Sequence, residues 1–208
     1  MGRLKILNHP LIEHKMAKIR DKKTGTKDFR EAVSEIGLLL TYEISRDFKT
    51  VPKTVETPLM ETTAYVLEKP VVIVPILRAG LGMVDGIHRI IPQAKIGHVG
   101  LYRDEETLQP HEYFAKFPAE IKESTVLVVD PMLATGGSAA ACITLLKRRG
   151  VTDIRFVGIV GCPEGVKFLQ KEHPDVDIYL AAMDEGLNER GYIYPGLGDC
   201  GDRLFGTK

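Results

Sequence analysis

Residues 124–138, STVLVVDPMLATGGS, combine an apolar run, one carboxylate and a turn with two glycines. Residues 126–129 predict a buried strand that ends at Asp130, and a helical pattern follows the turn. Residues 135–138 would bring consecutive backbone N–H groups to the helix N-terminus, where unsatisfied donors and the helix dipole favour an anion. The turn therefore predicts phosphate binding, with a simple capped strand–helix turn as the structural alternative.

Two common nucleotide-binding motifs do not match this turn. A Walker loop requires a lysine before the Ser or Thr that opens the helix, and Gly137 stands at that position. The dinucleotide fingerprint requires G-x-G-x-x-G after a first strand, and this strand comes late in the chain. Beside a bound phosphate, the Asp130 carboxylate is placed to accept hydrogen bonds from ribose hydroxyls or to attract a cation. The combination favours a phosphorylated sugar.

Three other segments carry residues that could take part in chemistry. Residues 75–83, PILRAGLGM, place Arg78 beside small residues, where it could bind an anion or lie on the surface of an ordinary loop. Residues 103–118 form a polar stretch that contains scattered aromatic residues and is bounded by proline. Taken alone they favour an ordinary surface loop, with a hairpin arm or flap over a site as the alternative. Residues 192–206 read as a long glycine-rich C-terminal loop, structural or a lid.

These segments require an α/β scaffold to position them. Short β-branched apolar runs occupy residues 71–77, 96–102, 125–130, 154–161 and 176–184, and helical patterns occupy residues 81–91 and 138–149. Alternation of this kind predicts a mostly parallel sheet flanked by helices. In such sheets ligands bind at the carboxyl ends of the strands, which each segment of interest follows.

The length of 208 residues suits one domain, residues 1–208, with two domains as the alternative. We expect a mainly helical part over residues 1–70, an α/β core over 71–184 and a C-terminal segment over 185–208. Within the first part, apolar residues at helical spacing run from Phe29 to Ile44. Such a helix covers the core of its own chain or forms a dimer interface.

Composition argues against several classes of protein. Lysine plus arginine equals aspartate plus glutamate, at 28 each, so no basic surplus indicates nucleic acid. No apolar run approaches the ~20 residues that cross a bilayer, and the N-terminal stretch lacks the pattern of a signal peptide. Three widely spaced cysteines predict neither a disulfide framework nor a zinc site. We therefore expect a cytoplasmic protein without a membrane or nucleic-acid partner.

Residues 126–138, VLVVDPMLATGGS, resemble the phosphoribosyl pyrophosphate (PRPP) signature of type I phosphoribosyltransferases. Most of those enzymes carry two adjacent acids here, and the Asp130–Pro131 pair resembles the uracil phosphoribosyltransferases in particular. The segments around Arg78, Arg103 and residues 192–206 resemble that family in the same order. The resemblance thus spans essentially the whole chain.

The resemblance implies a type I phosphoribosyltransferase fold with a β-arm and a C-terminal base-binding hood loop. It implies the conversion of uracil and PRPP to UMP and diphosphate in pyrimidine salvage, with Arg103 and Asp130 as catalytic residues. The implied PRPP-binding residues are Arg78, Arg103, Asp130, Pro131, Met132, Leu133, Ala134, Thr135, Gly136, Gly137, Ser138 and Asp199. The implied uracil-binding residues are Ile193, Gly198, Asp199 and Cys200.

The same resemblance implies Mg²⁺ held mainly by PRPP and water, with no dedicated metal ligands on the protein. It also favours a homodimer or higher homo-oligomer and suggests GTP as an effector in some members. Cys200 departs from the small residue, such as Ala, that we associate with the uracil branch, and it reads best as an apolar filler. A regulator of the same fold that binds nucleotide or RNA, and a purine or orotate enzyme, are the alternatives.

Overall fold

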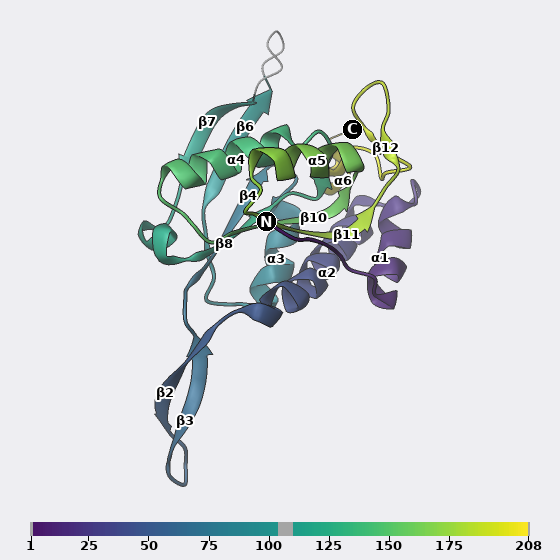
Figure 1. The fold of residues 1–208 in the computed structure, drawn as a ribbon. Helices are drawn as coiled ribbons and strands as arrows, with labels where there is room; N and C mark the ends of the chain where they lie inside the picture. Colours follow the sequence, from purple (N-terminus) through teal and green to yellow (C-terminus); the bar gives the residue numbers. More distant parts are fainter. Residues whose placement is uncertain (1, 104–109, 208) are drawn as a thin grey trace.

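The computed structural model describes residues 2–103 and 110–207 (Figure 1). Its main sheet has the strand order β1-β11-β10-β8-β4-β6-β7, and every neighbouring pair is parallel except the antiparallel β6–β7 hairpin. The strands are β1 (Leu4–Ile6), β4 (Val71–Leu77), β6 (His98–Arg103), β7 (Pro110–Lys116), β8 (Thr125–Val129), β10 (Ile154–Gly161) and β11 (Asp177–Met183). The prediction of a mostly parallel sheet is confirmed.

Two short strands extend this sheet. Strand β5 (Lys95–Ile96) pairs with β4, and β9 (Met132–Leu133) pairs with β10. The run predicted as one strand over residues 96–102 is therefore split between β5 and β6. The N–H group of Gly97, at the break, still donates to the Ile73 carbonyl.

Helices cover both faces of the sheet and bury two apolar cores. One face carries α1 (Pro10–Arg20), α2 (Thr26–Ile44) and α3 (Leu81–Ile90), and the other carries α4 (Gly137–Arg148) and α5 (Pro163–Glu172) (Figure 1). The predicted amphipathic helix is confirmed as α2, which buries Phe29, Ile36 and Leu40. Because α1 and α2 pack on their own sheet, their apolar stripes serve the core of this chain.

A two-stranded hairpin leaves the body between α2 and β4. Its strands are β2 (Thr50–Glu56) and β3 (Glu61–Leu67), and it projects away from the end that carries the β6–β7 hairpin (Figure 1). The expectation of a mainly helical part over residues 1–70 is incomplete, because it missed this hairpin and β1. Most β2 and β3 side chains remain exposed, so no apolar alternation identifies them.

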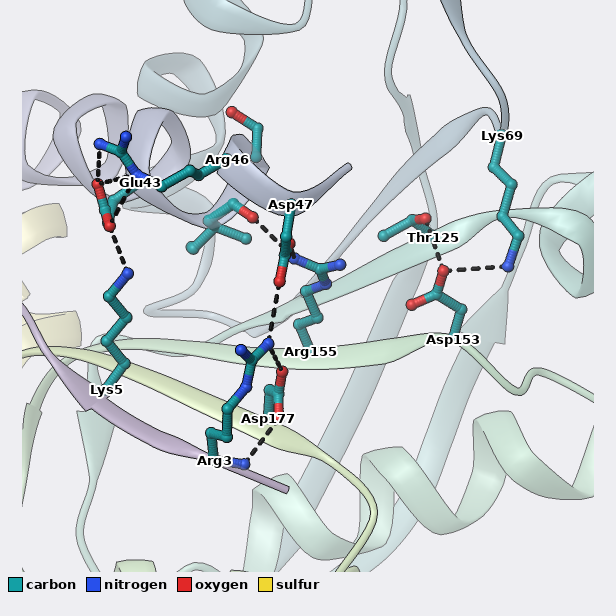
Figure 2. A network of polar contacts seen from close by, with 12 residues as sticks. Arg3, Lys5, Glu43, Arg46, Asp47, Lys69, Thr125, Asp153, Arg155 and Asp177 are labelled. Carbon is teal, nitrogen blue, oxygen red and sulfur yellow. Dashed lines mark hydrogen bonds and ion pairs between the residues drawn. The ribbon is translucent and has the colours of Figure 1, made fainter. Parts of the chain in front are cut away.

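An ionic network fixes the base of that hairpin at the amino-terminal ends of the strands (Figure 2). Arg155, at the start of β10, donates to the Ile44 carbonyl at 2.7 Å and pairs with Asp47 in the short 3₁₀ helix η1 (Ser45–Asp47). Arg3 pairs with both Asp47 and Asp177 at 3.0 Å. The end of α2 and η1, which lead into the hairpin, are thereby joined to β10 and β11, far from the strand ends that face the site.

The direction of the chain reverses between β4 and β8, which are neighbours in the sheet. After β4 the chain moves through α3 toward β6, whereas after β8 it moves through α4 toward β10, and these two helices lie on opposite faces. In open α/β sheets, ligands bind in the crevice at such a switch point, outside the carboxyl ends of the strands. Among the described residues, no helix is long and apolar enough to cross a membrane.

Candidate active site

The loops after β4 and β8 meet at the switch point. A Cβ atom added to Gly80 would lie 2.5 Å from the carbonyl oxygen of Val129, the last residue of β8. Only a residue without a side chain permits this approach, since real Cβ contacts are longer. Gly80 thus brings the Arg78 loop directly against the strand that presents Asp130.

Asp130 stands at the carboxyl end of β8 in the middle of the sheet. Its backbone N–H donates to Val157 on β10, and its Oδ1 atom accepts the N–H of Met132 at 3.1 Å. Although part of the residue stays exposed, the carboxyl group is desolvated, and this raises the pKa of Asp130 to about 7 against the opposing effect of the Met132 N–H. Because burial disfavours the ionised form of this carboxyl group, a nearby cation or hydroxyl donors from a ligand would stabilise the carboxylate.

The turn after Asp130 delivers backbone donors to the start of α4. Strand β9 pairs with β10 and fixes the beginning of the turn, and Pro131 and Leu133 are buried under it. Gly136 adopts a left-handed conformation at φ 82° and is the N-cap of α4 without a side-chain hydrogen bond to the first turn. The Gly137 N–H lies 3.5 Å from Oγ1 of Thr135, a long contact that an anion can displace, and anion binding at this helix start stays a prediction.

Arg78 leaves the end of β4 toward the C-terminal helix α6 (Cys200–Phe205). Its Nη2 atom lies 3.4 Å from Oδ1 of Asp202, and its guanidinium lies 5.7 Å from the ring centroid of Phe205. The Arg78 side chain is 56% exposed, so its charge is accessible to a ligand. The peptide bond between Leu77 and Arg78 is cis.

The C-terminal segment forms a second small sheet and a helix, where the sequence predicted only a loop. Strands β12 (Gly186–Leu187) and β13 (Ile193–Tyr194) pair antiparallel, and α6 follows. Asp199 is the N-cap of α6, and its Oδ1 accepts the N–H of Asp202 at 2.9 Å. Ile193 is buried, whereas Gly198 and Asp199 are exposed.

Cys200 lies in the apolar core at the start of α6 and is only 3% exposed. Burial raises the pKa of its thiol, and the charges of Asp130 and Asp199 raise it further. The thiol is therefore protonated and unreactive, as its interpretation as an apolar filler requires. A Cβ atom added to Gly201 would lie 3.9 Å from Nη2 of Arg78, so the start of α6 lies beside the loop after β4.

Arg103 ends β6, and its backbone is paired with Pro110 across the hairpin. The antiparallel pairing of β6 with β7 confirms the alternative of a hairpin arm for the described residues of this stretch, and it contradicts the ordinary loop that the stretch favours when taken alone. Residues 104–109 and the side chain of Arg103 lie outside the described part. The role of Arg103 therefore stays a prediction.

The structure thus brings together the Arg78 loop, Asp130, the turn at 131–138 and the segment at 193–200. Sequence reasoning missed four residues that support this grouping: Arg20, Asp184, Asp202 and Arg203. Each is a charged residue whose partner lies far away in the sequence, as in the contact between Arg20 and Asp184. No local spacing signal identifies such pairs.

Comparison with known proteins identifies the family. A sequence profile described as uracil phosphoribosyltransferase matches residues 6–207. The chain belongs to the uracil phosphoribosyltransferase family. The chain is 69% identical to the uracil phosphoribosyltransferase of Acholeplasma laidlawii and 62% identical to that of Enterococcus faecalis, with full coverage of both chains in each case. Membership of this family makes the chain a pentosyltransferase.

Solved structures agree with this uracil phosphoribosyltransferase family assignment. A protein from Aquifex aeolicus superposes with a TM-score of 0.92 at 38% identity, covering 97% of each chain. The adenine phosphoribosyltransferase of Trypanosoma brucei, in complex with AMP, pyrophosphate and ribose-5-phosphate, gives a TM-score of 0.60 at 14% identity, covering 92% of this chain and 88% of its own. The second likeness shows the fold alone, which is the type I phosphoribosyltransferase fold.

Proposed function

We propose that the crevice at the ends of β4 and β8 transfers the phosphoribosyl group of PRPP to uracil, giving UMP and diphosphate in pyrimidine salvage. The observation that carries this proposal is the position of Asp130. It stands at the switch point, is followed by the glycine turn into α4, and adjoins the loop whose Arg78 contacts the C-terminal helix α6. A phosphorylated sugar is the ligand that matches a carboxylate beside a phosphate-binding turn.

In this proposal the turn at 134–138 holds the 5′-phosphate. The N–H groups at the start of α4 and the positive end of its dipole stabilise the anion, and the hydroxyls of Thr135 and Ser138 are further donors. Both of these side chains are exposed. Asp130 accepts hydrogen bonds from the ribose hydroxyls and so orients the anomeric carbon.

Diphosphate is the leaving group, and negative charge develops on it as the bond to the ribose breaks. Arg78 and Arg103 are proposed to offset that charge, the first from the β4 loop and the second from the base of the arm. Magnesium, when bound with PRPP, supplies further charge neutralisation; PRPP oxygens and water are its main ligands in this proposal, and Asp130 is the carboxylate placed near it. The arm and the C-terminal segment exclude water from the cationic centre.

Uracil is proposed to bind against the backbone of residues 193–200. Its two carbonyls and the N3–H require a matched set of backbone donors and acceptors, and cytosine would leave part of that set unpaired. Cys200 contributes packing rather than chemistry, because its side chain is buried and its pKa is raised. Asp199, exposed beside it, faces the phosphoribosyl side.

The direct test is an assay with radiolabelled uracil, PRPP and Mg²⁺, with hypoxanthine, adenine and orotate as competing bases. UMP formation that requires PRPP and is unaffected by the other bases is the expected result. Activity on a purine or orotate without UMP formation would refute the proposal. Repeating the assay with and without GTP tests the effector role that the family resemblance suggests.

The partners proposed beyond the substrates are further copies of this chain in the cytoplasm. The β2–β3 hairpin supports this, because a lone hairpin is marginally stable in water and this one exposes apolar side chains. Leu59 is 93% exposed, and Met60 and Tyr65 are each 69% exposed. Light scattering on the wild type and on Leu59→Ser/Met60→Ser should show a homo-oligomer that dissociates in the variant. A monomeric wild type would contradict the proposal.

A further inference from the structure

Helix α1 is joined to Asp184, the residue directly before the C-terminal segment, by an ion pair whose carboxylate is buried. Arg20, the last residue of α1, donates from Nη1 to Oδ2 of Asp184 at 2.8 Å and from Nη2 to Oδ1 at 2.5 Å. The Asp184 side chain is only 4% exposed, and that of Arg20 is 28% exposed. A bidentate pair of this kind fixes the orientation of both planar groups as well as their distance.

Arg20 and Asp184 each also form a hydrogen bond with the backbone of Gly196. The Gly196 N–H donates to Oδ2 of Asp184 at 2.8 Å, and the Gly196 carbonyl accepts from Nη1 of Arg20 at 2.8 Å. Three groups therefore close a ring in which each contacts the other two. Gly196 adopts φ 62°, and an added Cβ would lie 2.0 Å from the Ile193 carbonyl oxygen, so the segment is tightly folded at this point.

The guanidinium of Arg203 donates a hydrogen bond to the carbonyl of Leu197, the residue after Gly196. Arg203 on α6 donates to the Leu197 carbonyl at 2.8 Å and to the carbonyls of Ile19 and Asp21 at the end of α1. Its guanidinium also stacks over the ring of Phe29 at 4.2 Å from the centroid. Two consecutive carbonyls, those of Gly196 and Leu197, are thus held by arginines, directly before Gly198.

The other end of the ring is anchored in the sheet. The N–H of Asp184 donates to the Gly161 carbonyl at 2.8 Å, so the carboxylate is presented from the carboxyl ends of β10 and β11. Arg20 comes from a helix whose Ile12, Met16 and Ile19 are buried in the core. The ring therefore joins two rigid elements to a segment that has only short strands of its own.

We propose that Arg20 and Asp184 are positioning residues for uracil, which set the backbone of residues 196–198 so that its donors and acceptors match the base. This rests on the proposed base-binding role of residues 193–200. Neither residue needs to touch substrate. Backbone recognition depends on the direction of each N–H and C=O group, and the ring determines those directions by engaging both polar groups of Gly196.

The decisive variant is Arg20→Lys. A lysine preserves the positive charge beside Asp184, but one ammonium on a shorter stem cannot bind both carboxylate oxygens and the Gly196 carbonyl. We expect the KM for uracil to rise about tenfold while the KM for PRPP stays within about twofold, because the proposed contacts to PRPP come mainly from the loops after β4 and β8. Asp184→Asn, which keeps an oxygen for Gly196 but loses the charge, should give a smaller change in the same direction.

The matched control is Lys15→Met on the same helix. Lys15 pairs with Glu35 at 2.7 Å, away from the C-terminal segment, and this variant should leave both KM values unchanged. Each variant is assayed ~20 °C below its own midpoint of thermal unfolding, so that loss of folded protein does not enter the comparison. Calorimetry with UMP and with PRPP provides a second readout, and only UMP binding should weaken in Arg20→Lys.

Equal changes in the two KM values, or an unchanged KM for uracil in folded Arg20→Lys, would overturn the positioning role. Gly198→Ala separates this failure from failure of the base site itself. If Gly198→Ala raises the KM for uracil and Arg20→Lys does not, residues 193–200 bind the base without help from the ring. If neither variant affects uracil, the base-binding role of that segment is wrong as well.

Discussion

The Nη2 atom of Arg78 lies 3.4 Å from Oδ1 of Asp202, which joins the loop after β4 to helix α6. The carboxylate is only 14% exposed, whereas the arginine side chain is 56% exposed. An ion pair of this exposure contributes at most ~1 kcal/mol, so a diphosphate group can compete for the guanidinium. The same arginine therefore links the proposed diphosphate-binding loop to the C-terminal segment.

Replacement of Asp202 by Asn should make Arg78 more available to PRPP. We expect the KM for PRPP to fall by about two- to fivefold, which corresponds to ~1 kcal/mol or less. Steady-state kinetics at saturating uracil measure the effect. A higher KM for PRPP would show instead that Asp202 holds Arg78 in the binding position.

Asp130→Asn should weaken PRPP binding much more than uracil binding. The amide retains an oxygen but loses the charge that attracts a cation and strengthens hydrogen bonds from ribose hydroxyls, a loss of ~1.5–3 kcal/mol or about 10- to 100-fold in KM for PRPP. Competition experiments with each substrate held saturating separate the two KM values. Equal effects on uracil and PRPP would contradict the ribose role.

The same substitution should stabilise the protein without ligands in alkaline buffer. Desolvation raises the pKa of Asp130 to about 7 from an ordinary value of 3.8, so ionisation costs the folded state free energy. The stability that the protonated carboxyl preserves is fully present below pH ~4 and is lost as the pH rises through about 7. Asp130→Asn should therefore unfold at a higher temperature than the wild type at pH 8, with little difference at pH 4.

The control for that pH experiment is Asp28→Asn, at an exposed acid in the first turn of α2. It should show no comparable gain at pH 8. Scanning calorimetry across pH 4–8 records both variants. A midpoint of Asp130→Asn that follows the wild type at every pH would show that the carboxylate is not desolvated in solution.

Gly80→Ala should push the two active-site loops apart. The new methyl would lie 2.5 Å from the Val129 carbonyl and 2.8 Å from the backbone of Ile76. We expect a loss of ~1–3 kcal/mol in stability and a higher KM for PRPP. Gly25→Ala, where the added methyl meets no atom within 4 Å, is the control and should change neither by a comparable amount. An unaltered KM for PRPP in Gly80→Ala would show that the close approach of Gly80 to Val129 does not affect PRPP binding.

Arg155→Met should destabilise the fold without affecting catalysis. Its side chain is 13% exposed, donates to the Ile44 carbonyl and pairs with Asp47, at the end of the sheet opposite the site. We expect ~1–3 kcal/mol of lost stability, with both KM values unchanged. Arg46→Met, which breaks a pair whose arginine is 62% exposed, should cost no more than ~1 kcal/mol. Denaturant unfolding and steady-state kinetics measure the two effects.

The penalty from Arg155→Met should shrink in acid. Desolvation opposes ionisation of Asp47, but hydrogen bonds from Arg155 and Arg3 together hold its pKa below the usual value. The stability from the ionised carboxylate is therefore present above pH ~4 and is lost as the pH falls through the depressed pKa. A penalty that is constant from pH 7 to pH 3 would indicate that the Ile44 contact, and not the ion pair, carries the stabilisation.

The sequence by itself determined the features that depend on neighbours along the chain. Runs of β-branched residues predict buried strands, as at residues 71–77 and 154–161. The turn at 135–138 is predicted by its glycines and by the helical pattern that follows it. It left the β2–β3 hairpin unrecognised, because solvent on most of its surface removes the apolar alternation. It also gave no sign that residues 200–205 form a helix, since glycine-rich sequence favours a loop.

Only the tertiary structure decided which distant charges meet. Asp130 acquires its raised pKa from desolvation in the folded chain, and Arg20 pairs with Asp184 although 164 positions separate them in the sequence. Such pairings depend on the sheet order and on which helices share a face, and no local spacing encodes them. The glycine turn into α4 could therefore be predicted from its own residues, whereas the ring around Gly196 forms only because the fold places α1, the end of β11 and the C-terminal segment together.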